Sequence, residues 1–354
     1  MSLHFGIFDS FDLNHASVAE LLDDRLRFAA EAERLGISHY HVTEHHGTPL
    51  SVCPSPNIFT AALTQRTSSM RIGALVNVLP AYDPFRLAEE IATLDQLAHG
   101  RLDLGVGAGV SPIELGFVRD RVDDARAVYQ ETLTAITAAL ATGRMTHDGT
   151  LLRSYDAALS VRPVQRPYPP IWYASGNAAS AEWAGANSVN FVGRWENGAM
   201  ADIAETYWTA WAKEDDHDLR LNPSVTDPRV GISGPVVIAR STAEAEDLFA
   251  SANALHEQRI LHLWHERGDH RLDGVFSTER VLAAGNGVYG TVAEVRDRIV
   301  HQVEHADINY YEMKICFGDI TLDQAQYTAR AVMELIAPAA REAAVRTSRF
   351  ANAG

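Results

Sequence analysis

Apolar and polar residues follow two patterns that alternate along this chain. Short runs rich in β-branched and aromatic residues, which are typical of strands, occupy residues 4–10, 37–46, 71–80, 101–109, 171–176, 189–194, 229–239 and 309–318. Longer segments with the apolar spacing of helices follow them at 17–35, 55–69, 83–100, 123–142, 178–186, 200–213, 241–267 and 322–343. Capping signals support these limits, because Asp83 and Pro84 begin one predicted helix and Gly100 ends it. The pattern therefore predicts eight strands, each followed by a helix.

Strands that alternate with helices in this way favour parallel pairing with right-handed crossovers, so we predict a closed (β/α)8 TIM barrel. A doubly wound open sheet is the alternative. It is disfavoured because no GxGxxG motif opens the first unit, and the nearest match, GVGAGV at 105–110, lies in the fourth. We expect residues 1–354 to form a single barrel domain with loop excursions at 144–170 and 265–290.

Composition narrows the functional class. The chain has 354 residues, 46% of them apolar and 21% charged, which suits a large globular protein. A net charge of −16 argues against a surface for nucleic acid or anionic membrane. Cys53 and Cys316 are the only cysteines, too few for a disulfide framework. The start, MSLHFGIFDSF, lacks a basic and apolar leader pattern, so we expect a cytoplasmic enzyme.

One predicted strand becomes polar where it should finish, in HYHVTEHHG at 39–47. Strand parity places Tyr40 and Val42 against the helices and the odd-numbered residues in the barrel. His45 should then point into a cavity at the barrel mouth, where an imidazole can exchange a proton near neutral pH. Glu44 should lie to the side as a hydrogen-bond acceptor, and His46 should point away from the cavity. The alternative is that these polar residues only hold a loop in place.

We expect no metal site. The two histidines of HYH at 39–41 resemble the His-x-His of zinc barrels, but no later strand end supplies the further ligands that zinc requires.

Glycines at the predicted strand ends suggest room for a flat cofactor. Gly105, Gly107 and Gly109 allow a ligand to approach the backbone closely. The segment ASGNAAS at 174–180 ends a strand and begins a helix, so its free N–H groups and the side chains of Asn177 and Ser180 could seat a phosphate.

Three segments together resemble the bacterial luciferase-like flavin monooxygenases: EHH at 44–46, the long block at 72–109, and SAEWAG at 180–185. The similarity runs from residue 4 to about residue 340. It implies a (β/α)8 barrel that oxygenates a small apolar substrate of aldehyde, ketone or alkane type. The oxidant would be O₂ with reduced FMN from a separate flavin reductase, acting through a flavin C4a-hydroperoxide. A homo-oligomer, with a dimer favoured, is also expected.

The resemblance also implies roles for individual residues. His45 matches the active-site histidine beside the flavin, with Glu44 as its helper. Leu75 and Val76 match a non-prolyl cis peptide beneath the ring, and Trp195 an indole near it. The full set of expected cofactor contacts is Leu75, Val76, Asn77, Gly107, Ala108, Gly176, Asn177, Ala178, Ser180 and Trp195.

The chain departs from the family at Ala108, where many members carry an arginine that holds the FMN phosphate. Asn177 and Ser180 then remain as neutral donors, or Arg194 replaces the missing cation. Two alternatives stay open: a non-catalytic flavin-binding homologue, and a deazaflavin-dependent dehydrogenase on the same barrel.

Overall fold

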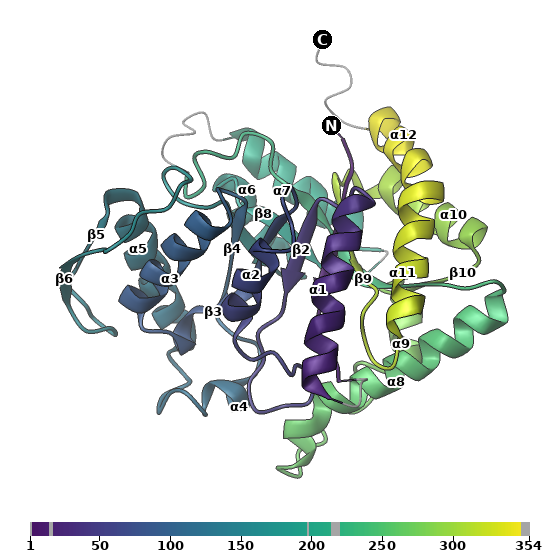
Figure 1. Cartoon of the computed structure of the whole chain (residues 1–354), viewed down its shortest axis with the longest axis horizontal. Coiled ribbons are helices and arrows are strands. Elements are labelled where there is room, and N and C mark those ends of the chain that lie inside the picture. The colour runs from purple at the N-terminus through teal and green to yellow at the C-terminus, as the bar shows by residue number, and fades with distance from the viewer. Residues whose placement is uncertain (1, 14–16, 197, 214–219, 348–354) are drawn as a thin grey trace.

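A computed structural model describes residues 2–13, 17–196, 198–213 and 220–347 of the chain (Figure 1). Eight parallel strands form a closed barrel: β1 (His4–Asp9), β2 (His39–Val42), β3 (Arg71–Val78), β4 (Leu102–Gly107), β7 (Ile171–Ala174), β8 (Asn190–Gly193), β9 (Val230–Ile238) and β11 (Tyr310–Lys314). The pairing of β8 with β9 closes the sheet. The predicted TIM barrel is confirmed, and each predicted strand overlaps one of these eight.

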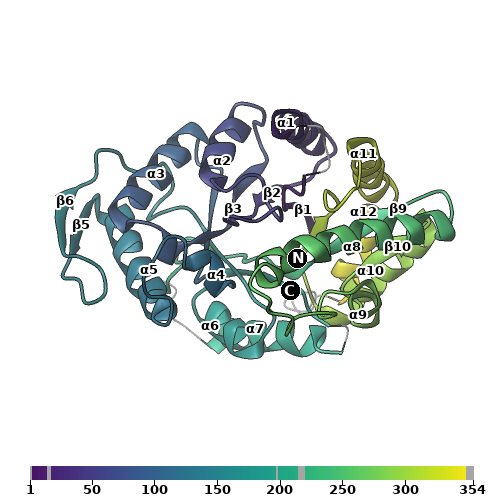
Figure 2. The same cartoon turned by 90° about the horizontal axis from the view of Figure 1, so that it is seen from below.

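Helices surround the barrel on its outer face (Figure 2). The main ones are α1 (Val18–Arg34), α2 (Pro56–Thr64), α3 (Pro84–Leu97), α5 (Ala125–Thr142), α6 (Ala178–Ala186), α7 (Met200–Lys213), α8 (Thr242–His265) and α11 (Leu322–Ala331). After α11 a π-helical stretch, Val332–Ile336, leads into α12 (Ala337–Thr347). The Asp83 side chain caps α3 by accepting from the N–H groups of Phe85 and Arg86, as the sequence predicts.

Smaller elements occupy the two predicted excursions. In the first, β5 (Arg144–His147) and β6 (Tyr155–Ala158) form an antiparallel hairpin that lies outside the barrel, at the left edge of Figure 1. In the second, α9 (Thr278–Ala283) is followed by β10 (Val288–Gly290), which pairs with the end of β9. Two other short elements are α4 (Pro112–Leu115) and a 3-10 turn at Leu79–Ala81.

One helix is absent from the sequence prediction. Helix α10 (Val292–Ala306) precedes β11 and packs against α12. Its N-terminus carries a capping box, in which Thr291 accepts from Glu294 N–H and the Glu294 carboxylate accepts from Thr291 N–H. The signal T-x-x-E before an apolar pattern could have revealed it.

The barrel interior holds an aromatic and ionic layer. The Trp172 ring packs 4.7 Å from the ring of His41. His41 Nδ1 lies 2.7 Å from Glu312 Oε1, and His41 Nε2 lies 3.3 Å from Asp103 Oδ2. Arg71 also donates to Asp103, at 2.7 Å. Burial alone would lower the pKa of His41, but its hydrogen bonds with the two carboxylates raise it to about 9, so the buried imidazole is cationic at neutral pH.

The strands end on one face of the barrel, and α8 passes over this mouth in Figure 2. In the described part of the chain, no helix combines the length and apolar character needed to cross a membrane.

Candidate active site

A cavity of about 320 Å³ opens at the mouth beside the ends of β2, β3 and β4, and we call it the histidine cavity. Its lining residues include Phe8, Thr43, Glu44, His45, His46, Leu75, Val76, Gly107, Ala108, Glu114, Arg126, Tyr173 and Ala174. The expected catalytic pair and four of the expected cofactor contacts thus lie around one space.

Strand parity holds within β2 and stops where the strand stops. Tyr40 packs against Phe28 of α1, while His41 points into the barrel. The predicted strand ran to residue 46, but β2 ends at Val42. His46 therefore does not point away from the cavity as parity predicted: it lines the cavity together with His45.

The Glu44 side chain is completely buried and accepts three hydrogen bonds. It accepts from the N–H of Val78 and the hydroxyl of Tyr82, both at 2.9 Å, and it contacts Nε2 of His46 at 2.8 Å. The hydrogen bond to Glu44 is the main cause that raises the pKa of His46. Glu44 therefore orients the loop and the neighbouring imidazole, as expected of an acceptor at the side of the cavity.

His45 is paired with a residue that sequence reasoning missed. Its Nδ1 lies 3.3 Å from both carboxylate oxygens of Glu114, and its side chain is 19% exposed. Glu114 also accepts from the N–H of His46, at 2.8 Å. Burial raises the pKa of Glu114, but the contacts with His45 and His46 outweigh it and hold the pKa below its usual value. Ser111 caps α4 and accepts from Glu114 N–H, so the S-x-x-E spacing at 111–114 was a usable signal.

The floor of the histidine cavity is formed by β3 and β4. The peptide bond between Leu75 and Val76 is cis, as the resemblance implied. The register of β3 against β4 shifts between Ala74 and Asn77. A Cβ atom at Gly107 would lie 2.5 Å from Val76 Cγ2, so only glycine fits there against the bulged strand. The result is an open, side-chain-poor floor of the kind that a planar ring system can cover.

A surface groove of about 660 Å³ adjoins the histidine cavity between α5 and α6. Asn177 caps α6 by accepting from Ser180 N–H at 2.8 Å, and both residues line the groove. Arg126 and Tyr173 line the groove and the histidine cavity alike. No ion pair of Arg126 occurs within the described ranges. Sequence reasoning missed this arginine, because only the fold places the start of α5 at the cavity.

Four expected cofactor residues lie elsewhere, and one of them, Gly176, lines a neighbouring cavity together with Arg194. Trp195 is 1% exposed, stacks on Phe191 at 5.6 Å and donates to the carbonyl of Ser175 at 3.0 Å. It lines neither the histidine cavity nor the α5–α6 groove. Asn77 is buried and donates to Gly105 O at 3.2 Å, which joins β3 to β4. Ala178 begins α6 without lining the cavity or the groove.

One cluster away from these spaces could hold a metal ion by distance alone. His265, His270 and Asp273 bring their ligand atoms within 4.8 Å of one another, and all three are exposed. Asp273 already contacts both imidazoles, at 2.6 and 3.1 Å, so a hydrogen-bonded surface cluster accounts for it.

Comparison with known proteins agrees with this geometry. The family model for luciferase-like monooxygenases matches residues 3–308. The chain is 34% identical over 337 residues to protein y4wF of Sinorhizobium fredii, covering 93% of this chain and 95% of that one. It is 30% identical over 173 residues to the oxygenase component of a flavin-dependent trigonelline monooxygenase of Acinetobacter baylyi, covering 48% of each.

The fold is shared with the oxygenating constituent of 3,6-diketocamphane monooxygenase from Pseudomonas putida, solved in complex with FMN. The TM-score is 0.75 at 18% identity, covering 96% of this chain and 98% of that one. From the match of the family model and the full-length similarity, the chain belongs to the luciferase-like monooxygenase family.

Proposed function

We propose that this protein is the oxygenase component of a two-component system that oxygenates a small, largely apolar substrate with O₂ and reduced FMN. The observation that carries the proposal is that the histidine cavity and the α5–α6 groove adjoin, with Arg126 and Tyr173 lining both. A flat ring would lie over Leu75, Val76 and Gly107. Its phosphate tail would pass Tyr173 and reach the N-terminus of α6.

The phosphate would meet donors and a positive charge at that end. Asn177 and Ser180 offer polar groups at the first turn of α6, where backbone N–H groups also favour an anion. Arg126 supplies the cation that Ala108 cannot, so the departure at position 108 does not leave the phosphate without a charged partner. Arg194, the substitute suggested by the sequence, lines a different cavity.

Bound reduced FMN would supply the electrons with which O₂ is activated for transfer of one oxygen atom. His45 presents its Nδ1 to Glu114, which leaves Nε2 to give or take a proton in the cavity. Leu75, Val76 and Phe8 would exclude water from the reacting centre. Because the sequence has no dinucleotide fingerprint, a separate reductase would provide the reduced flavin.

Anaerobic titration with reduced FMN tests this function. We expect saturable binding, tighter than that of oxidised FMN, no binding of NADPH, and weaker binding of a deazaflavin. Arg126→Gln should weaken FMN binding roughly tenfold or more, the loss expected when a charge-assisted contact disappears.

Arg66→Gln is the matched control, since Arg66 is an exposed arginine next to the C-terminal end of α2, away from the mouth. Absence of saturable binding at millimolar FMN would refute the flavin function, and tighter deazaflavin binding would favour the dehydrogenase alternative. FMN binding without any O₂ consumption across a panel of aldehydes, ketones and alkanes would favour the non-catalytic homologue.

A further inference from the structure

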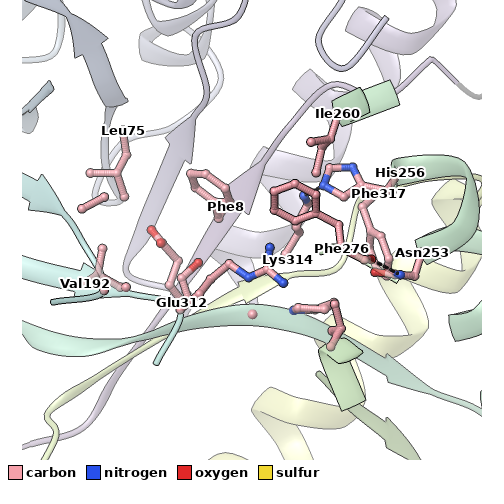
Figure 3. A pocket seen from close by; sticks show the side chains of 18 of the residues that line it. Phe8, Leu75, Val192, Asn253, His256, Ile260, Phe276, Glu312, Lys314 and Phe317 are labelled. Atoms are coloured by element: carbon pink, nitrogen blue, oxygen red, sulfur yellow. Dashed lines mark hydrogen bonds between the residues drawn. The ribbon is translucent and has the colours of Figure 1, made fainter. Parts of the chain in front are cut away.

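A second cavity of about 320 Å³ lies beside the histidine cavity, and the two share Phe8, Leu75 and Ala174. Its walls are mainly apolar and aromatic, with Val192, Ile260, Phe276 and Phe317 among them (Figure 3). Two cationic side chains, Arg194 and Lys314, line the same space, and we call it the cation cavity.

Lys314 has a neutral partner in place of a carboxylate. Lys314 and His256 lie side by side in Figure 3, with Nζ 2.5 Å from Nε2 of His256. Nδ1 of His256 lies 2.9 Å from Asp12 Oδ2. Burial and the nearby Lys314 lower the pKa of His256 to about 4, so this imidazole is uncharged at neutral pH. Burial is also the main cause that lowers the pKa of Lys314, to about 7. Lys314 is therefore about half protonated at neutral pH, and its hydrogen-bond partner is an uncharged imidazole.

Arg194 adds a second positive charge close by. It lies near enough to Lys314 and His256 to contribute to the lowered pKa of both. Burial lowers the pKa of Arg194 itself. Within the described residues, neither Arg194 nor Lys314 has a carboxylate oxygen within 4.0 Å.

Two carboxylates nearby, Asp12 and Glu312, have other cations or donors as partners, and Glu312 also lines the cation cavity. Asp12 contacts Arg259 at 3.5 Å and accepts from the N–H of Gly318 at 2.7 Å. Glu312 pairs with the cationic His41 at 2.7 Å. Positive charge is therefore in excess at the surface of the cation cavity, although Arg194 also reaches solvent and Lys314 is only partly charged at neutral pH.

We propose that the cation cavity binds the carboxylate group of an amphipathic substrate, with Arg194 and Lys314 as the anion-binding pair and the aromatic wall around the apolar body. This proposal rests on the proposed function, because it names the substrate class of the same site. The volume is at the small end of ligand pockets, which suits a medium-length alkanoate or an arylalkanoate. The carboxylate end would lie at Lys314, and the apolar end would extend past Phe8 and Leu75 toward His45.

Binding to the flavin-free protein tests the proposal independently of flavin chemistry. The probes are octanoate and 3-phenylpropanoate, each compared by calorimetry with its primary amide, which has the same shape and no charge. We expect each carboxylate to bind roughly tenfold or more tightly than its amide. Equal affinities, or no saturable binding of either carboxylate at millimolar concentration, would overturn the proposal whether or not FMN binds.

Two arginine variants separate a substrate carboxylate from a flavin phosphate, since both are anions. Arg194→Gln should remove the preference for carboxylate over amide and leave the affinity for reduced FMN unchanged. Arg126→Gln should do the reverse. If Arg194→Gln instead weakens FMN binding and leaves octanoate binding unchanged, the cation pair serves the phosphate and the proposal is wrong.

Lys314→Met provides the second variant, with its folding checked by circular dichroism. It should lose the carboxylate preference while retaining affinity for octanamide, because the apolar wall is unchanged. Retention of the preference by both Arg194→Gln and Lys314→Met would also overturn the assignment.

Discussion

Strand β2 and the loop after it carry two pairs of histidines in opposite surroundings. His39 and His41 lie inside the barrel, where the His41 side chain is 0% exposed and is held between Glu312 and Asp103. His45 and His46 lie at the mouth, with side chains 19% and 27% exposed, and each contacts one glutamate. Both ring nitrogens of His41 contact carboxylates, whereas His45 contacts Glu114 through Nδ1 and leaves Nε2 available to a ligand.

The two pairs show that the position of a histidine in β2 or the loop after it does not by itself determine its role. His41 supports the barrel interior, whereas His45, four residues further along the chain, is a candidate for the chemistry. The number of charged partners and the access to a cavity decide which role a histidine has, and four predictions test the contrast.

The largest expected effect is on stability. His41→Leu would leave Glu312 and Asp103, both nearly fully buried, without their shared cation, and should lower the free energy of unfolding by about 3–5 kcal/mol. His45→Leu, at the partly exposed mouth, should change it by less than about 1 kcal/mol. Urea unfolding followed by circular dichroism measures both. Similar losses of unfolding free energy in the two variants would contradict the proposed difference between the interior and the mouth.

The second expected effect is on activity. His45→Ala should lower coupled turnover by about 10²–10⁴-fold, as loss of a general acid or base does, while the protein still folds and binds reduced FMN. Oxygen consumption and hydrogen peroxide release are measured with a substrate that the wild type oxygenates. His46→Ala should be milder, because Glu44 keeps its bonds from Val78 and Tyr82. Near-normal coupled turnover in His45→Ala would make this histidine structural.

The third effect depends on pH. The pKa of His41 in the folded protein is about 9, above the 6.5 of an ordinary histidine. Its contribution to stability is therefore fully present below pH 6.5 and is lost as the pH rises through 9. At about 1.36 kcal/mol per pKa unit, the stability difference between wild type and His41→Gln should shrink by about 3 kcal/mol from pH 6 to pH 9.5. A difference independent of pH would mean that His41 is neutral in the barrel.

The smallest effect concerns the mouth alone. Ala108→Arg would place a second guanidinium on the histidine cavity beside Arg126, and FMN binding should tighten by at most about 1.5–3 kcal/mol, reduced by the cost of ordering the side chain. Ala108→Gln is the uncharged control. The melting temperature should not change, since the site is open. Unchanged affinity in a folded Ala108→Arg variant would place the phosphate away from residue 108.

The sequence by itself determined the eight strands, most helices and the position of the mouth, because periodicity and capping are local properties. It also pointed to EHH at 44–46, which does line a cavity at the mouth, and, through resemblance alone, to the cis peptide between Leu75 and Val76. The missed helix α10 carried a readable capping box, so that omission was not a limit of the sequence.

Only the tertiary structure decided which charged groups meet. His41 and Glu312 are 271 residues apart in the chain, His45 and Glu114 are 69 apart, and Lys314 and His256 are 58 apart. Each pair depends on barrel closure, strand register and the direction of side chains, and a local sequence pattern determines none of these. The sequence showed that the mouth is polar. The fold decided that one cavity there has a histidine paired with a glutamate, and that the neighbouring cavity has two basic side chains without a carboxylate of the described residues within 4.0 Å.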